Sequence, residues 1–219
     1  MENAAKQFDG RESKTWTLYS LLACVVFRFT SSQPLYCFRN NVCLFGNMKV
    51  SVVEYCPQWR EMFEEEKQLL QTVLCEVSAK VEHIGSTAVI GLAAKPIIDI
   101  MIGLSNFSVA DELVPRIEAL SYEYFKKYED EMPYRRYLAK NLNEIRTHQI
   151  HMVEIGSEFW RRHLLFRNYL QQNPEMANEY AALKKQLAEH DWADVNEYAD
   201  AKTEFIMGIE NKAKEQITA

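Results

Sequence analysis

The segment Val81–Ile102 constrains the fold of this chain more than any other part of the sequence. It contains two runs of β-forming residues, Val81–Ile84 and Ile97–Ile102, joined by a loop that begins with a glycine and two small polar residues at 85–87. A single charged residue, Asp99, interrupts the second run. Burial of an unpaired carboxylate costs several kcal/mol, so an acid among isoleucines usually binds a metal or joins a hydrogen-bonded network. The segment therefore predicts two strands, with a functional acid on the second.

The loop between these two strands has the residues of a phosphate-binding turn. Gly85 allows the backbone to approach a ligand closely. Ser86 and Thr87 offer hydroxyl groups and backbone N–H groups at the start of a short helix. A tight turn with a capping serine would account for the same residues without a ligand. Together with Asp99, the loop indicates a site for phosphate and a metal ion.

The rest of the chain reads as a mixture of strands and helices. Helical periodicity and helix-start residues predict helices over 57–79 and 110–120 and three more beginning near Ser157, Pro174 and Asp194. Alternating or β-rich segments predict strands or extended segments at 50–55, 122–128, 135–140 and 146–155. The order of these elements is typical of an α+β fold with a small sheet and a helical C-terminal portion.

Composition limits the partners that this chain can have. Its 219 residues fit one domain, and a net charge of -6 with a pI near 5.5 provides no basic field for nucleic acid or an anionic membrane. We therefore expect neither partner. The five cysteines form no C-x-x-C pair, and an odd number does not suit a secreted disulfide framework. We expect reduced thiols and a cytoplasmic protein.

Residues 1–47 differ from the segment that follows them. Their one apolar run, Leu18–Phe27, is shorter than the roughly 20 residues that a membrane span needs. Basic residues precede this run, as in a secretory signal, but acidic residues lie among them and no small-x-small cleavage pattern follows. We expect a disordered or non-native leader at 1–47 and one domain at 48–219.

Four stretches of the sequence resemble the GrpB family, which is assigned to the nucleotidyltransferase fold of DNA polymerase beta. They read VSVVEYCPQWREMFEEEK, HIGSTAVIGLAAKPIIDI, HQIHMVE and FRNYLQQNPEMANEYAALKKQLA. The resemblance runs from about Met48 to the C-terminus. It implies a small mixed or antiparallel sheet flanked by helices, in a nucleotidyltransferase-like core with a helical C-terminal portion.

The resemblance also implies roles for particular residues. In this fold, two carboxylates two residues apart on one strand hold Mg²⁺ or Mn²⁺, and Gly85, Ser86 and Thr87 match the turn that cradles the nucleotide's phosphates. Asp99 matches the first carboxylate, but Met101 stands at the second position, and a thioether is a poor ligand for magnesium. Two-metal chemistry therefore requires another acid, such as Glu154 on a neighbouring strand.

The other candidate site residues each have more than one possible role. Lys95 could bind phosphate or could pair with Asp99. Arg167 lies on a helix that otherwise faces the core, so we expect it to pair with Asp99 or Glu154 or to contact the ligand. His151 belongs to the family pattern HxxHxVE and is a candidate catalytic residue, although a lone histidine is more often a hydrogen-bonded core residue. A zinc site is also open, if His83, Asp99 and His151 converge.

Two functional hypotheses follow from these residues and from the resemblance. The first is a nucleotidyltransferase that binds a nucleoside triphosphate with a divalent metal ion at Asp99. The second is a non-catalytic module that binds a nucleotide or a protein. Family members are also found fused to dephospho-CoA kinase, which by resemblance suggests a partner in coenzyme A metabolism. Met101, at the position of the second strand acid, distinguishes the two hypotheses. It argues against two-metal catalysis unless another acid, such as Glu154, replaces the missing ligand.

Overall fold

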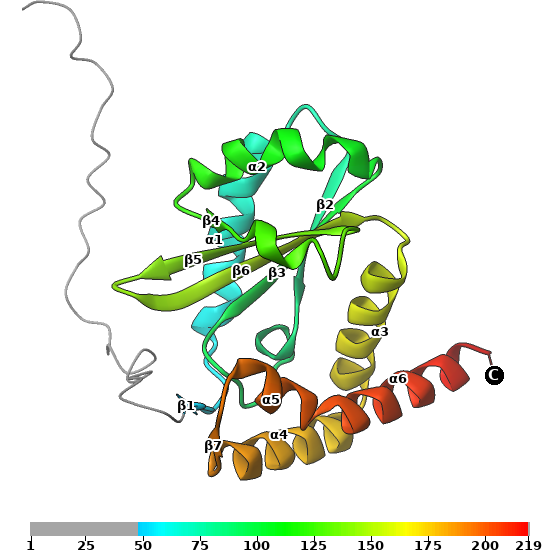
Figure 1. Ribbon diagram of the computed structural model, residues 1–219. Helices are drawn as coiled ribbons and strands as arrows, with labels where there is room; N and C mark the ends of the chain where they lie inside the picture. The colour runs from blue at the N-terminus through cyan, green and yellow to red at the C-terminus, as the bar shows by residue number, and fades with distance from the viewer. Residues whose placement is uncertain (1–47, 219) are drawn as a thin grey trace, which may run out of the picture. The chain divides into compact units, whose positions relative to one another are not determined.

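The structure is a computed structural model that describes residues 48–218 (Figure 1). The leader expected at 1–47 lies outside the described residues. The helices are α1 (Gln58–Val73), α2 (Ala110–Glu118), α3 (Glu158–Gln172), α4 (Pro174–Ala188), α5 (Val195–Asp200) and α6 (Thr203–Thr218), with 3-10 turns η2 (Ser86–Ala88), η3 (Phe107–Val109) and η4 (Lys126–Tyr128). None of these described helices combines the length and the apolar character that crossing a membrane would need.

One mixed sheet of five strands organises the domain. Its strands are β2 (Ala79–Ile84), β3 (Ile98–Leu104), β4 (Glu123–Tyr124), β5 (Arg135–Leu142) and β6 (Ile145–Glu154), in the spatial order β2-β3-β6-β5-β4. Strands β3 and β6 are parallel, and the other neighbours are antiparallel. A separate short pair joins β1 (Met48–Lys49) to β7 (Asp191–Trp192). The α+β class with a small mixed sheet is thereby confirmed.

One face of the sheet carries the main core. The even-numbered isoleucines of β3, from Ile98 to Ile102, are fully buried there. Helices α1 and α2 cover this face with large apolar side chains, among them Trp59, Leu70 and Ile117. Full burial of each such side chain contributes about 1.5–3 kcal/mol. Alternate side chains of β3 therefore belong to this core.

The opposite face of the sheet carries Asp99 and a second apolar cluster. Met101 is fully buried there with Ile84, Val153 and Trp160. A β-carbon at Gly103 would overlap the Trp160 ring, so the glycine allows α3 to pack closely on the sheet. Helix α3 thus covers the part of this face beyond Met101, and Asp99 lies nearer the start of the strand.

Several predicted elements are shorter than expected. The extended segment at 50–55 forms one bridge, between Val53 and Ala94, and α1 ends at Val73. The strand expected at 122–128 is reduced to β4, because the chain then turns into η4. This turn brings Phe125 and Tyr128 against the Tyr137 ring, with centroids 5.6 and 5.4 Å away. Aromatic packing here takes precedence over strand propensity.

The C-terminal helices begin where their capping residues predict. The Ser157 hydroxyl accepts a hydrogen bond from the Trp160 backbone at 3.2 Å, and Asp194 caps α5 in the same way. Their apolar side chains enclose Val89 and Leu92 of the loop that follows η2. In Figure 1, α4, α5 and α6 lie beyond the end of the sheet at which β3 begins. This packing brings the C-terminal helices next to the loop and to Asp99.

Candidate functional site

Asp99 is held by a chain of hydrogen bonds that crosses three strands. It lies opposite Gln149 of β6, whose side-chain nitrogen donates to the Asp99 carboxylate. The hydroxyl of Tyr137 donates to the Gln149 side-chain oxygen at 2.7 Å, and Arg146 donates to the Tyr137 hydroxyl at 3.0 Å. Because the amide oxygen is engaged by Tyr137, the amide nitrogen faces Asp99. The network therefore fixes the orientation of the acid.

The loop before β3 closes against the same acid. Gly85 has a φ of 69° and a ψ of -168°, and a β-carbon there would overlap the Asp99 carboxylate. The sequence predicts that this glycine lets the backbone approach a ligand closely. In the structure, the group that it allows close to the backbone is Asp99 itself.

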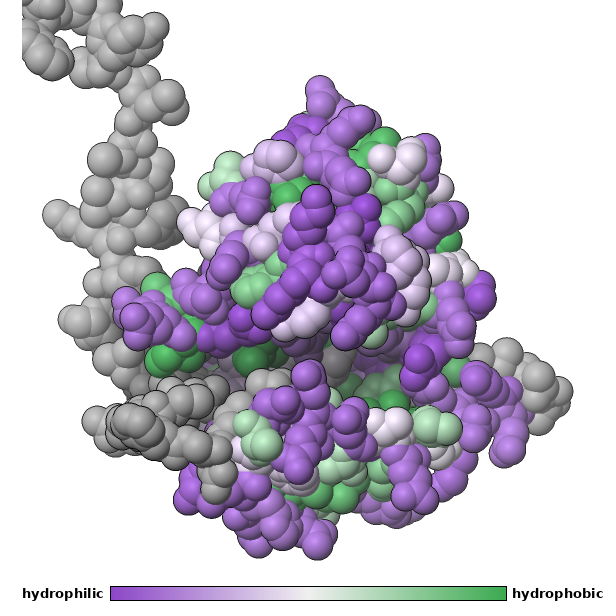
Figure 2. All heavy atoms as spheres, viewed as in Figure 1, coloured by the Kyte–Doolittle hydropathy of each residue, from purple (hydrophilic) through white to green (hydrophobic). Residues whose placement is uncertain are grey.

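Lysines from three different elements gather around Asp99, and we call them the lysine cluster: Lys95 before β3, Lys184 on α4 and Lys202 between α5 and α6. The Lys95 and Lys202 ammonium groups lie 4.3 and 4.2 Å from the centre of the Tyr198 ring. The Lys184 ammonium lies 4.5 Å from the centre of the Tyr180 ring and donates to the Ala93 carbonyl at 2.5 Å. Figure 2 shows the surface hollowed between the sheet and α5.

Burial favours the neutral forms of the lysine side chains and of the Asp99 carboxyl group in this site. It lowers the pKa of Lys184 to about 7 and the pKa values of Lys95 and Lys202 to about 8. It raises the pKa of Asp99 to about 6, against the opposing effects of the Gln149 hydrogen bond and the lysine cluster. Three poorly solvated lysines thus surround one acid. The excess of positive charge favours an anionic ligand.

Two tyrosines and Ser86 complete the site. Ser86 lies beside Tyr180, where its hydroxyl opposes the effect of burial, which raises the pKa of the tyrosine. Tyr198 is 1% exposed, and its hydroxyl has no hydrogen-bond partner among the residues that the structure describes. A buried hydroxyl without a partner costs about 1–3 kcal/mol. A ligand that accepts a hydrogen bond would remove this cost. We call the group formed by Asp99, Ser86, Tyr198 and the lysine cluster the Asp99 site.

Thr87 does not share the position of its neighbour Ser86. Its hydroxyl donates to the Ile97 carbonyl at 3.2 Å and lies 3.0 Å from the His83 ring nitrogen. The side chain is 3% exposed. Thr87 therefore stabilises the loop, and of the three expected cradle residues the structure places Gly85 directly against the acid.

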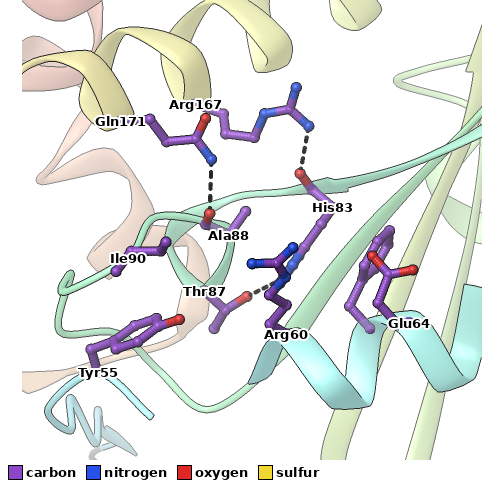
Figure 3. A pocket seen from close by; sticks show the side chains of 10 residues that line it. Tyr55, Arg60, Glu64, His83, Thr87, Ala88, Ile90, Arg167 and Gln171 are labelled. Carbon is purple, nitrogen blue, oxygen red and sulfur yellow. Dashed lines mark hydrogen bonds between the residues drawn. The ribbon is translucent and has the colours of Figure 1, made fainter. Parts of the chain in front are cut away.

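Arg167 pairs with a different acid from the ones expected. Its guanidinium donates to Glu82 and to the His83 carbonyl, both at 2.8 Å (Figure 3). The sequence-based pairing with Asp99 or Glu154 is therefore wrong. Strand β2, which lies at the edge of the sheet beside β3, supplies both of the actual partners. Arg167 instead lines a separate cavity of about 280 Å³ with Tyr55, Arg60 and Gln171.

Glu154 and His151 both lie on β6, but neither is next to Asp99. Glu154 is paired with Leu104, and five residues of strand correspond to roughly 16 Å. At this distance, Glu154 and Asp99 cannot bind the same metal ion. His151 lies on the face of Asp99 but opposite Met101, 5.3 Å from the Tyr137 ring. Burial holds its pKa well below the usual value, so the ring is neutral.

The residues around Asp99 do not fit a divalent metal ion. His83 lies on the other face of the sheet, where its ring stacks on Phe63 at 4.6 Å, so the zinc set with Asp99 and His151 does not converge. Within residues 48–218, no group of three or more histidine, cysteine or acidic side chains could hold a metal. Asp99 already accepts a hydrogen bond from Gln149, and the lysine cluster repels a cation.

Sequence reasoning missed the larger part of this site. Gln149, Tyr180, Lys184, Tyr198 and Lys202 were not among its candidates. One signal was present: Lys184 follows Tyr180 by four residues, so both lie on the buried side of α4. A lysine on the buried stripe of a helix is unusual.

Comparisons with known proteins agree on one family. A model of the GrpB protein family matches residues 49–212. The crystal structure of GrpB from Enterococcus faecalis is similar with a TM-score of 0.68 and 42% identity, covering 77% of this chain and 100% of that chain. UPF0157 protein YqkA of Bacillus subtilis (strain 168) is 40% identical over 171 residues, 78% of this chain and 49% of YqkA. The chain therefore spans about half the length of YqkA.

A dephospho-CoA kinase also contains a similar region. The enzyme is from Mycolicibacterium paratuberculosis (strain ATCC BAA-968 / K-10) and is 26% identical over 186 residues. The match covers 75% of this chain and 46% of the kinase.

Proposed function

This chain belongs to the GrpB family, and on that premise we propose that it binds a nucleoside triphosphate at the Asp99 site. The observation that carries the proposal is the convergence of the lysine cluster on Asp99 beside Ser86. Buried ammonium groups that outnumber nearby carboxylates favour a multiply charged anion, and a triphosphate is such an anion. The nucleoside part of the proposal follows from the resemblance to the nucleotidyltransferase fold.

Lysine suits this role because its ammonium group is a compact charge with three hydrogen-bond donors. In the free protein, burial of the cluster disfavours the charged form of each lysine. A bound phosphate replaces the lost water and favours the charged form again. Ligand binding therefore relieves an unfavourable arrangement of the free protein.

Nucleotidyl transfer is the reaction that this arrangement fits best. An acceptor hydroxyl attacks the α-phosphorus, and the new P–O bond forms as the bond to pyrophosphate breaks. Asp99, with a pKa raised to about 6, is ionised at neutral pH and accepts the proton of the acceptor as a general base. The lysine cluster stabilises the charge that develops on the leaving pyrophosphate.

Thermal unfolding tests whether the ligand binds. The four nucleoside triphosphates and inorganic tripolyphosphate are each added with and without magnesium, manganese or zinc. A ligand at about one hundred times its Kd should raise the Tm by roughly 5–10 °C, because it binds the native state alone. Lys185→Met is the matched control, since Lys185 adjoins the cluster in sequence but pairs with Glu54 at 2.5 Å. No shift with any triphosphate would contradict the proposal.

Turnover is tested separately, by pyrophosphate release in the presence of small hydroxyl acceptors. We expect Asp99→Asn to reduce the rate by about a hundredfold or more, because the amide cannot accept the proton. Retention of the wild-type rate would exclude Asp99 as the base.

A second candidate function is a role beside a dephospho-CoA kinase. The observation that favours it is the similar region within the mycobacterial kinase. The test adds this chain to a separately purified dephospho-CoA kinase and measures its kcat and KM. A change in either constant that the denatured chain does not produce would support the role, and unchanged constants would count against it.

A further inference from the structure

We infer that the lysine cluster and the Tyr198 hydroxyl bind the phosphate groups of the ligand directly, in the place that divalent cations take in nucleotidyltransferases. The inference rests on the proposed function, because it specifies how the Asp99 site holds its ligand. Side chains of this chain thereby take over the neutralising role of magnesium or manganese.

Among the described residues, no second carboxylate lies next to Asp99. Met101, which occupies the expected position, is fully buried between Ile84 and Val153, where no hydrated ion could reach it. On the neighbouring strand, Gln149 directs its amide nitrogen at Asp99. An amide nitrogen is a hydrogen-bond donor, so it cannot coordinate a cation. The site offers one carboxylate where two-metal chemistry requires at least two.

The lysine cluster is held mainly by contacts that leave its hydrogen-bond donors unused. Lys95 and Lys202 both lie over the ring of Tyr198, and within residues 48–218 neither ammonium forms a hydrogen bond or an ion pair. Lys184 gives one proton to the Ala93 carbonyl, which leaves two donors. Cation–π contacts orient the ammonium groups without using their donors. The cluster therefore keeps most of its hydrogen-bonding capacity for a ligand.

The Tyr198 hydroxyl adds a further hydrogen-bond donor beside the lysine cluster. This side chain is 1% exposed, and its oxygen has no partner in the described part of the chain. It belongs to the same ring that orients Lys95 and Lys202. A phosphate oxygen bound by the two lysines would lie within reach of this donor. One ligand group thus satisfies both the buried cations and the buried hydroxyl.

If lysines bind the phosphates directly, magnesium should not strengthen ligand binding, whereas a metal site would require the ion for binding. Magnesium occupies phosphate oxygens and reduces the charge of the triphosphate, so it competes with the lysines. The test measures the affinity of the full chain for ATP and for tripolyphosphate by calorimetry, once with EDTA and once with magnesium. Lys184→Met and Lys202→Met remove single cluster members, Lys202→Arg retains the charge, and Lys185→Met is the control. A cooperative melting transition shows that each variant folds.

We expect affinity in EDTA to equal or exceed affinity in magnesium. We also expect Lys184→Met and Lys202→Met each to weaken binding about tenfold or more, and Lys202→Arg to weaken it less. Binding that requires magnesium would overturn the inference and leave the proposed function standing. Affinities unchanged by both substitutions would overturn the inference and would also place the ligand outside the Asp99 site. Failure of the wild-type chain to bind either probe in both buffers would overturn both.

Discussion

Gly85 and Asp99 are in such close contact that a β-carbon at position 85 would overlap the Asp99 carboxylate. The backbone conformation of Gly85, with φ 69° and ψ -168°, is one that other residues rarely adopt. The loop at Gly85 and strand β3 at Asp99 therefore pack together without room for a side chain between them. The acid is held against the loop backbone on one side and by Gln149 on the other.

The contact between Gly85 and Asp99 predicts a specific loss of stability. Gly85→Ala should cost about 1–3 kcal/mol for backbone strain and more for the collision with the carboxylate. Gly91→Ala is the matched control, because Gly91 has a φ of 80° but nothing within 4 Å of its β-carbon. Denaturant melts should therefore show the larger loss for Gly85→Ala. Equal losses for the two variants would mean that the contact with Asp99 is unimportant.

The burial of Met101 predicts that a second acid cannot be restored on β3. Met101→Asp places a carboxylate within the apolar cluster of Ile84, Val153 and Trp160, and should destabilise the fold by about 3–5 kcal/mol. Met101→Leu keeps the volume and should cost less than about 1.5 kcal/mol. Denaturant melts with and without manganese measure both effects. A stable Met101→Asp variant that manganese stabilises further would show that the position can serve as a metal ligand.

The lysine cluster predicts that stability rises with pH. Burial lowers the pKa of Lys184 from 10.5 to about 7, so between these values the unfolded chain binds more protons than the native chain. The free energy of unfolding therefore increases as the pH rises through this window. From about pH 7 to about pH 10, wild type should gain about 3 kcal/mol more than Lys184→Met.

Denaturant melts across this range, with Lys185→Met as a control that keeps the cluster, measure the difference between wild type and Lys184→Met. Parallel profiles for wild type and Lys184→Met would show that Lys184 has a normal pKa in the native protein.

The hydrogen bond from Gln149 predicts a measurable shift at Asp99. Donation from the amide nitrogen favours the charged carboxylate and lowers its pKa, against the larger effect of burial, which brings it to about 6. Gln149→Leu should therefore raise the pKa of Asp99 further. Carboxyl carbon NMR titration of both proteins measures the change. A pKa that stays the same or falls would contradict the hydrogen bond between Gln149 and Asp99.

Much of the fold could be predicted from local patterns. The apolar run after Pro96 predicted β3, Ser157 and Asp194 predicted the starts of two helices, and the quoted family stretches predicted the α+β class. These signals are local, since each depends on residues within one element. The strand expected at 122–128 failed because ring packing between Phe125 and Tyr137 decides the conformation there.

The candidate site was less predictable because it is assembled from distant parts of the chain. Asp99 stood out as a single acid in an apolar strand. Lys184 and Lys202 lie on the C-terminal helical segment, and sequence spacing does not indicate that they pack beside β3. For Arg167, charge alone could not choose among several acids, and the edge strand β2 supplied Glu82. The roles of Asp99, Ser86 and Lys95 stay predictions until a ligand is measured.

Asp99→Asn tests most directly whether the Asp99 site binds phosphate through its lysines. Removal of the negative charge leaves the lysine cluster with a stronger attraction for an anion. A change of about 1 kcal/mol corresponds to about a fivefold change in affinity. The measurement is the Kd of ATP for wild type and Asp99→Asn at neutral pH in EDTA, with cooperative melting as the check on folding. We expect Asp99→Asn to bind ATP about fivefold more tightly than wild type. An unchanged Kd would place the ligand elsewhere in the protein. A loss of affinity would make Asp99 itself the ligand-binding group.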